Sequence, residues 1–154
     1  MLDLPVEEQL KLLNEVEEGV LAFTNGTHPY CIPLGFVYIE GSIYISLFPK
    51  GRKMEYYLKN NNVCFNIFEW NKEHTGWGSV TIDGTLEEVK DLKVIEAVVK
   101  ANMAKMQQPP DYLEKRMKYY TKTADNENAL KIYKINTEKM GGKQRPATLT
   151  KPKD

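Results

Sequence analysis

Strand-like segments separated by short turns constrain the fold of this chain more than any other feature. Residues 20–24, 29–39 and 43–48 are rich in β-branched and aromatic side chains, which favour strands. Asn25-Gly26 lies between the first two segments and is a strong hairpin signal, and residues 40–42 form the next short turn. Strands joined by such short turns pair antiparallel with their neighbours. The sequence therefore predicts an antiparallel meander in this region.

Further strands are expected at residues 63–70, 76–89 and 129–136. The last of these alternates apolar and polar side chains, and Gly84 marks a bend in the middle one. Six short strands at hairpin spacing, interleaved with a few helices, predict a small antiparallel β-barrel. The chain has 154 residues and no linker-like stretch, so residues 1–154 are expected to form a single domain.

Helices are expected to flank the barrel. Residues 1–18 are predicted to form the first helix, with Asp3 as its N-cap. Three further segments have apolar side chains at helical spacing: residues 52–59, 91–106 and 112–120. Residues 137–154 are rich in Lys, Gly, Pro and Thr, and they predict an irregular tail, above all over residues 143–154.

The composition excludes several classes of function. The 21 basic and 21 acidic residues balance, which argues against a general nucleic-acid-binding protein, because such proteins carry a basic excess. No run of about 18 apolar residues is present, so no membrane span is expected. The N-terminus is unlike a signal peptide, and Cys31 and Cys64 lie in apolar strand-like segments without a Cys-x-x-Cys pair. We therefore expect a cytoplasmic protein with buried reduced thiols and no metal site.

A basic loop is the first candidate for a functional site. Gly51 interrupts the chain after the strand at residues 43–48, and the cations Lys50, Arg52 and Lys53 stand where the next helix begins. A helix N-terminus prefers acidic side chains, because its backbone N–H groups carry partial positive charge. Free N–H groups together with Arg and Lys form an anion site, and phosphate is its usual ligand. A solvated basic loop without a ligand is the alternative.

A second candidate lies in the strand expected at residues 29–39. Pro33 cannot donate a hydrogen bond to a neighbouring strand, and Gly35 weakens a strand interior. Together they indicate an edge strand, a bulge or a backbone that a ligand approaches closely. A bulge without function is the alternative that the residues leave open.

The segment from Ser46 to Tyr56 resembles the FMN-phosphate segment of the pyridoxamine 5'-phosphate oxidase-like split barrels. In that family a strand with small polar residues leads through a short loop to an Arg-Lys pair and then an acidic residue, as in Gly51-Arg52-Lys53-Met54-Glu55. The match is closest to the branch that includes the nitroimidazole-resistance proteins. The resemblance extends over roughly residues 18–142. Five other segments follow the family's order, the last of them as its closing turn: residues 19–23, 29–38, 63–65, 77–89 and 139–143.

The resemblance implies a mainly β fold, a six-stranded antiparallel split β-barrel with flanking helices, which binds FMN. By position in the family, Arg52 and Lys53 after Gly51 would bind the FMN phosphate. Ser46 would donate its hydroxyl near the phosphate or the ribityl chain. Members of the family are typically homodimers with FMN at the subunit interface.

The resemblance also places residues at the flavin ring. Pro33, Leu34 and Gly35 would flank the ring with exposed backbone. Ser79 lies where the family often has a polar residue that reaches the flavin, from the same subunit or from its partner.

The chain departs from the family in two places. Ser46, Leu47 and Phe48 stand where many relatives of this branch have His, Ser and Ala, and the bulky Phe48 can narrow the phosphate end of the site. No histidine follows His74, whereas pyridoxamine 5'-phosphate oxidases proper end in a substrate-binding segment with Arg and His. Oxidation of pyridoxamine phosphate is therefore not expected.

We expect an FMN-dependent oxidoreductase, a reductase that acts on a small molecule, in which the flavin carries the redox chemistry. No catalytic side chain is assigned, because His28 lies in a predicted turn and His74 in a polar loop. The alternatives are a non-enzymatic flavin-binding or redox-sensing protein, a haem-binding relative, and a relative that binds a deazaflavin. The substrate and the electron donor do not follow from the sequence.

Overall fold

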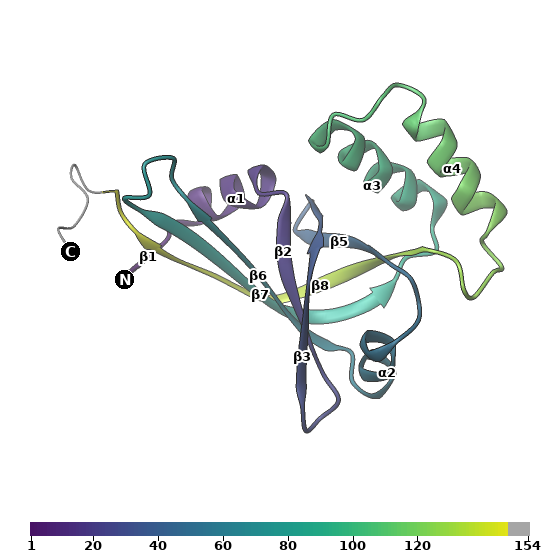
Figure 1. Ribbon diagram of the computed structural model, residues 1–154, viewed down its shortest axis with the longest axis horizontal. Coiled ribbons are helices and arrows are strands. Elements are labelled where there is room, and N and C mark those ends of the chain that lie inside the picture. The colour runs from purple at the N-terminus through teal and green to yellow at the C-terminus, as the bar shows by residue number, and fades with distance from the viewer. Residues whose placement is uncertain (148–154) are drawn as a thin grey trace.

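The computed structural model describes residues 1–147, which form one antiparallel sheet and four helices (Figure 1). The strands are β1 (Leu2–Asp3), β2 (Glu18–Thr24), β3 (Pro29–Gly35), β4 (Val37–Ile39), β5 (Ser42–Leu47), β6 (Asn62–Trp70), β7 (Trp77–Glu88) and β8 (Lys131–Arg145). The helices are α1 (Val6–Glu15), α2 (Arg52–Lys59), α3 (Leu92–Lys105) and α4 (Tyr112–Lys122). Figure 1 shows α1 beside the long arm of β6, β7 and β8, and α3 and α4 at the opposite end.

The sheet curls on itself because its two end strands are consecutive in the chain. Its order is β3-β2-β6-β7-β8-β5-β4, with β1 paired to β8 outside this path. Between β3 and β4 stands only Phe36, whose backbone N–H donates to the carbonyl oxygen of Glu17 at 3.4 Å. One residue cannot span the width of a flat sheet of this size, since neighbouring strands lie about 4.8 Å apart. The sheet is therefore rolled into a split barrel, which confirms the predicted fold class.

The sheet has eight strands in the described residues instead of the six that were expected. The strand expected at residues 29–39 is divided at Phe36, because its two halves pair with different neighbours, β2 and β5. At the N-terminus, Leu2–Asp3 adds the short strand β1.

The expected irregular tail is wrong over residues 137–145, because β8 continues to Arg145. β8 pairs with β7 from Tyr133, opposite Glu88, to Arg145, opposite Trp77. The long β7 offers a partner to each of these residues except Glu138, and such pairing outweighs the low strand propensity of Gly and Lys. Residues 148–154 of the expected tail lie outside the described residues.

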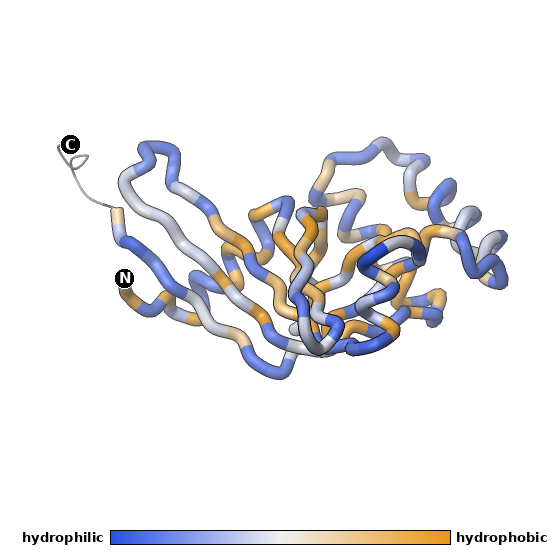
Figure 2. The backbone as a smooth tube through the Cα atoms, turned by 60° about the horizontal axis from the view of Figure 1, so that its bottom comes forward, coloured by the Kyte–Doolittle hydropathy of each residue, from blue (hydrophilic) through white to orange (hydrophobic). Residues whose placement is uncertain are grey.

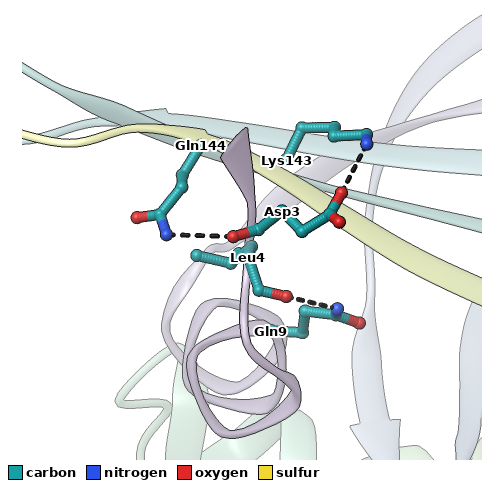
Figure 3. Close-up of polar contacts among 5 residues, drawn as sticks. All are labelled: Asp3, Leu4, Gln9, Lys143 and Gln144. Atoms are coloured by element: carbon teal, nitrogen blue, oxygen red, sulfur yellow. Dashed lines mark hydrogen bonds and ion pairs between the residues drawn. The ribbon is translucent and has the colours of Figure 1, made fainter. Parts of the chain in front are cut away.

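Asp3 does not cap α1, which is also shorter than the helix expected over residues 1–18. Asp3 lies in β1 beside β8 instead (Figure 3). Its carboxylate accepts a hydrogen bond from Nζ of Lys143 at 2.5 Å, and its carbonyl oxygen accepts one from Nε2 of Gln144 at 3.0 Å. The extended β8 therefore provides the partners that draw Asp3 away from the helix.

Two apolar clusters hold the molecule together, and Figure 2 shows hydrophobic residues concentrated in the central strands. The larger cluster fills the barrel, and α1 and α2 contribute Leu13 and Tyr56 to it. The smaller cluster fixes the α3–α4 hairpin to β4 and β8. Its buried members are Val37, Ile95, Val98, Val99, Tyr120 and Ile132.

The two thiols are free, but only one of them is even partly buried. Cys64 is partly buried in β6, whereas Cys31 is exposed on β3, so the expectation of two buried thiols is wrong. Within residues 1–147, no helix is both long and apolar enough to cross a membrane. The same residues contain no group of three or more His, Cys, Asp or Glu side chains arranged to hold a metal ion.

Candidate functional site

The start of α2 concentrates positive charge at a helix N-terminus. Gly51 precedes the helix with φ = 80°, a left-handed conformation that favours glycine, and no side chain caps the helix. The N–H groups of Met54 and Glu55 both donate to the carbonyl oxygen of Gly51 at 3.2 Å. The N–H groups of Arg52 and Lys53 have no partner within the helix, as is usual for a first turn. They remain available to a ligand or to water.

Two tyrosines hold the side chain of Arg52 in place. Its Nε and Nη2 donate to the hydroxyl of Tyr56, one turn later, at 3.3 and 3.1 Å. The guanidinium carbon lies 4.4 Å from the ring centroid of Tyr30 in β3 and 5.2 Å from that of Tyr56. The two rings pack edge to face with their centroids 5.8 Å apart. These contacts orient the guanidinium while leaving some of its five N–H groups for an anion.

Lys50 and Lys53 complete this cation cluster, which we define as Lys50, Arg52 and Lys53. Nζ of Lys53 donates to the carbonyl oxygen of Lys50 at 3.0 Å. Nζ of Lys50 lies 5.4 Å from the ring centroid of Phe48, which is itself exposed on the loop. In the part of the chain that is described, no ion pair involves any of the three cations. Their charge is therefore available to an external anion.

Pro33, Leu34 and Gly35 lie at the end of β3, which is an edge strand of the sheet. Pro33 and Gly35 are exposed, whereas Leu34 packs against the barrel core. An edge strand tolerates proline because one of its sides makes no ladder of hydrogen bonds. Tyr30, which contacts Arg52, lies five residues before Gly35, or about 16 Å along the strand. The open edge of β3 can therefore extend a site that begins at the cation cluster.

Ser46 lies on the outer face of β5. Ser46 is exposed on β5 between the buried residues Ile45 and Leu47, so its side chain points away from the barrel core. It faces Tyr120 of α4. Burial raises the pKa of Tyr120, and a hydrogen bond with Ser46 acts in the opposite direction.

Ser79 lies on the outward face of β7, where its hydroxyl accepts a hydrogen bond from Nδ2 of Asn66 at 2.9 Å. Pro33 is exposed on the same face of the sheet. However, β2 and β6 lie between β3 and β7, which separates the two residues by about 14 Å. Within one chain, Ser79 is therefore not adjacent to the edge of β3.

Lys105, at the end of α3, binds the backbone of Phe36, where the chain passes from β3 to β4. Its Nζ donates to the carbonyl oxygen of Phe36 at 2.9 Å and lies 3.8 Å from the ring centroid of the same residue. Burial lowers the pKa of Lys105 to about 8, against the charge of Glu17, which raises it. A side chain of α3, far away in the sequence, thus fixes the position of Phe36, the residue after Gly35.

Sequence reasoning missed the residues that position this site. Tyr56 follows Arg52 by four residues, a spacing that brings side chains together on a helix, so this contact had a usable signal. Tyr30 and Lys105 reach their partners only after the barrel has closed, and no local pattern predicts those contacts. The hydrogen bond from Asn66 to Ser79 likewise depends on the register of β6 against β7.

The pyridoxamine 5'-phosphate oxidase family model matches residues 5–144, which is most of the chain. The chain belongs to this family. The resemblance that begins with the Gly51-Arg52-Lys53 segment is thereby confirmed. No curated protein sequence matches the chain.

Solved structures of other proteins share the fold of this chain. An FAD-binding protein of Mesorhizobium loti matches with a TM-score of 0.65 and 23% identity, covering 94% of this chain and 97% of that one. A candidate 5-nitroimidazole antibiotic resistance protein of Bacteroides thetaiotaomicron has a TM-score of 0.72 and 20% identity, covering 93% and 86%. The FAD-binding protein of Mycobacterium smegmatis has a TM-score of 0.61 and 17% identity, covering 94% and 98%. At these identities the similarity establishes the fold alone.

The lowered pKa of Lys105 in this family member gives a testable pH dependence. An unfolded lysine keeps a pKa near 10.5, so between about pH 8 and pH 10.5 the unfolded chain binds more protons at this side chain than the folded chain. Over that window the free energy of unfolding of the wild type should therefore rise with pH relative to that of Lys105→Met. Urea unfolding of both proteins measures the difference. Parallel pH profiles would contradict the prediction.

Proposed function

We propose that the chain is a flavoprotein that binds FMN and acts as an oxidoreductase, namely a reductase of a small molecule. The observation that carries this proposal is the uncapped N-terminus of α2 with the side chains of Arg52 and Lys53 beside it. Backbone N–H groups at a helix start, together with Arg and Lys, form a favourable site for phosphate. The absence of ion pairs to these cations within residues 1–147 supports an external anion as their partner.

The neighbouring residues fit the rest of FMN. The phosphate would bind to the side chains and N–H groups of Arg52 and Lys53. The flavin ring would lie along the open edge of β3, where the exposed backbone around Pro33 and Gly35 permits close approach, with Leu34 packed behind it. Because Ser46 faces α4 in the structure, this proposal places no cofactor contact on it.

When bound, the flavin supplies the hydride and electron transfer of the reaction. The chain's own residues bind and orient it, and Tyr30 and Tyr56 hold Arg52 ready for the phosphate before it arrives. We assign no side chain to proton transfer, because His28 and His74 are both exposed in turns. The same exposure argues against haem, since neither histidine offers an axial ligand from the core.

FAD is the second candidate cofactor, because two of the similar structures are of FAD-binding proteins. We favour FMN because the cation cluster at α2 is one compact group of charges, which suits a single terminal phosphate. Mass spectrometry of the cofactor released by heating distinguishes FMN from FAD.

We further propose a homodimer that uses the outward face of β2, β6 and β7. Val20, Phe68 and Trp70 are 40%, 46% and 38% exposed there. Phe68 packs against Trp70 and Trp77 with ring centroids 5.8 and 5.4 Å away, which makes a continuous aromatic patch. Exposed apolar patches mark interaction surfaces. Ser79 pairs with Phe68 in the β6–β7 register, so this interface would bring Ser79 next to the partner subunit.

Replacing both cations should weaken FMN binding strongly without unfolding the barrel. Charge-assisted hydrogen bonds contribute about 1.5–3 kcal/mol each, so Arg52→Ala combined with Lys53→Ala should raise the Kd for FMN at least about 100-fold. Flavin fluorescence titration measures this change. Lys59→Ala, at the other end of the same helix, is the matched control and should change the Kd less than about twofold. A double variant with the affinity of the wild type would refute the phosphate site.

Charge placed in the aromatic patch should dissociate the proposed homodimer. Phe68→Glu introduces a carboxylate that the interface would have to bury without a partner, which is costly. Sedimentation velocity should show the wild type as a dimer and Phe68→Glu as a monomer that retains less FMN. Met106→Glu is the control, because Met106 is 47% exposed but lies just beyond α3. A monomeric wild type, or a Phe68→Glu variant that stays dimeric, would contradict this interface.

A further inference from the structure

A cavity lies on the side of α2 that faces away from Arg52. Its volume is about 760 Å³, and α2, the end of β7, the start of β8 and the α3–α4 hairpin line it. Figure 1 shows these elements gathered around the end of β7. Helical spacing puts Met54, Tyr57 and Leu58 on this side of α2, and Arg52 and Tyr56 on the opposite side. The cavity has the size of small-molecule sites, about 300–1,000 Å³, and none of the three residues of the cation cluster lines it.

Glu88 places a carboxylate in the wall of this cavity. The inward-facing row of β7 is buried and apolar until Glu88 continues it at the end of the strand, where it lies opposite Tyr133 of β8. Tyr57 and Tyr133 line the same cavity as Glu88. Burial and then the charge of Glu88 raise the pKa of both tyrosines, and Glu87 adds to the effect on Tyr57. Its ion pair with Lys90 is long, at 3.9 Å, and the Lys90 side chain is 85% exposed. Such a contact neutralises little of the charge on Glu88.

Tyr133 adds a buried hydroxyl with a weak partner. Its side chain is 1% exposed, and its hydroxyl donates to Sδ of Met54 at 4.0 Å, which is a poor acceptor. Burial raises the pKa of Tyr133 to about 12, so the hydroxyl keeps its proton at neutral pH. The ring of Tyr57 packs edge to face against that of Tyr133, with centroids 5.8 Å apart and planes at 82°. A polar group this deeply buried normally has a stronger partner.

We propose that this cavity binds a small organic cation, a protonated amine with an apolar or aromatic body. Glu88 would supply the opposite charge, and the partly exposed ring of Tyr57 would supply an aromatic face that attracts an ammonium group. The apolar side chains of Leu58 and Ile95, which also line the cavity, would receive the body of the ligand. The proposal goes beyond flavin binding, because it concerns a second site on the other side of α2.

The other charged groups of the cavity favour a cation over an anion. Asp125 and Glu127, both exposed, line the cavity together with Glu88. Lys90 and Lys131 are the cations among its lining residues, all of which belong to the described part of the chain. Three carboxylates thus stand against two ammonium groups, and the side chain of Lys90 extends into solvent. An anionic ligand of the same size would lie against the carboxylate of Glu88, whose side chain is only 28% exposed.

Calorimetric titration of the purified full chain at neutral pH with three probes of one size tests the proposal. Benzylamine, which is protonated under these conditions, should bind saturably, benzyl alcohol should bind at least about tenfold more weakly, and benzoate should not bind. Glu88→Gln should weaken benzylamine binding at least about tenfold. Glu87→Gln is the matched control, since Glu87 is exposed on the opposite face of β7, and it should change the affinity less than about twofold.

Two further variants keep the test decisive if Glu88→Gln does not fold. Tyr57→Leu keeps an apolar side chain and removes the aromatic face, and it should weaken benzylamine binding about threefold to tenfold. The double variant Arg52→Ala with Lys53→Ala should bind benzylamine like the wild type, which separates this site from the proposed flavin site. Three results would overturn the proposal: a folded wild type that does not bind benzylamine, equal binding of benzoate, or equal losses in Glu87→Gln and Glu88→Gln.

Discussion

The pairing of β7 with β8 is the interaction on which the rest of the structure depends. These strands join the two halves of the curled sheet, β3-β2-β6 and β5-β4. At one end β8 holds β1 through Asp3 and so anchors the start of α1. At the other end the same ladder sets Glu88 opposite Tyr133 and creates the wall of the cavity behind α2. Gly84 lies at the irregularity of this ladder, because any side chain there would overlap the carbonyl oxygen of Asn136.

Within this frame, α2 separates two surfaces of opposite chemical character. Eight residues are too few for a stable isolated helix, so α2 depends on its packing. Tyr56 packs on one side, where it meets Tyr30 and orients Arg52, and Tyr57 packs on the other side against Tyr133. The first side presents cations and free N–H groups to an anion. The second side presents the ring of Tyr57 and faces the carboxylate of Glu88 in β7, and both groups suit a cation. One short helix can thus serve two different ligands.

The sequence predicted the parts of the fold that local patterns determine. Turn signals and alternation located the strands, and the strand–loop–helix around Gly51 was recognised together with the cations Arg52 and Lys53. The extension of β8 and the position of Asp3 were mispredicted, because both depend on a partner strand far away in the sequence. The contact of Arg52 with Tyr30 and the pairing of Glu88 with Tyr133 likewise exist only once the barrel has closed.

The central claim, that the N-terminus of α2 binds the phosphate of FMN, is tested most directly by the visible absorption spectrum of freshly purified protein, recorded again after addition of FMN and desalting. We expect a flavin spectrum that survives desalting at about one FMN per chain, because buried and charge-assisted contacts hold the cofactor. A colourless protein that loses added FMN on desalting would contradict it. The cation cluster would then belong to a different ligand or to the solvent.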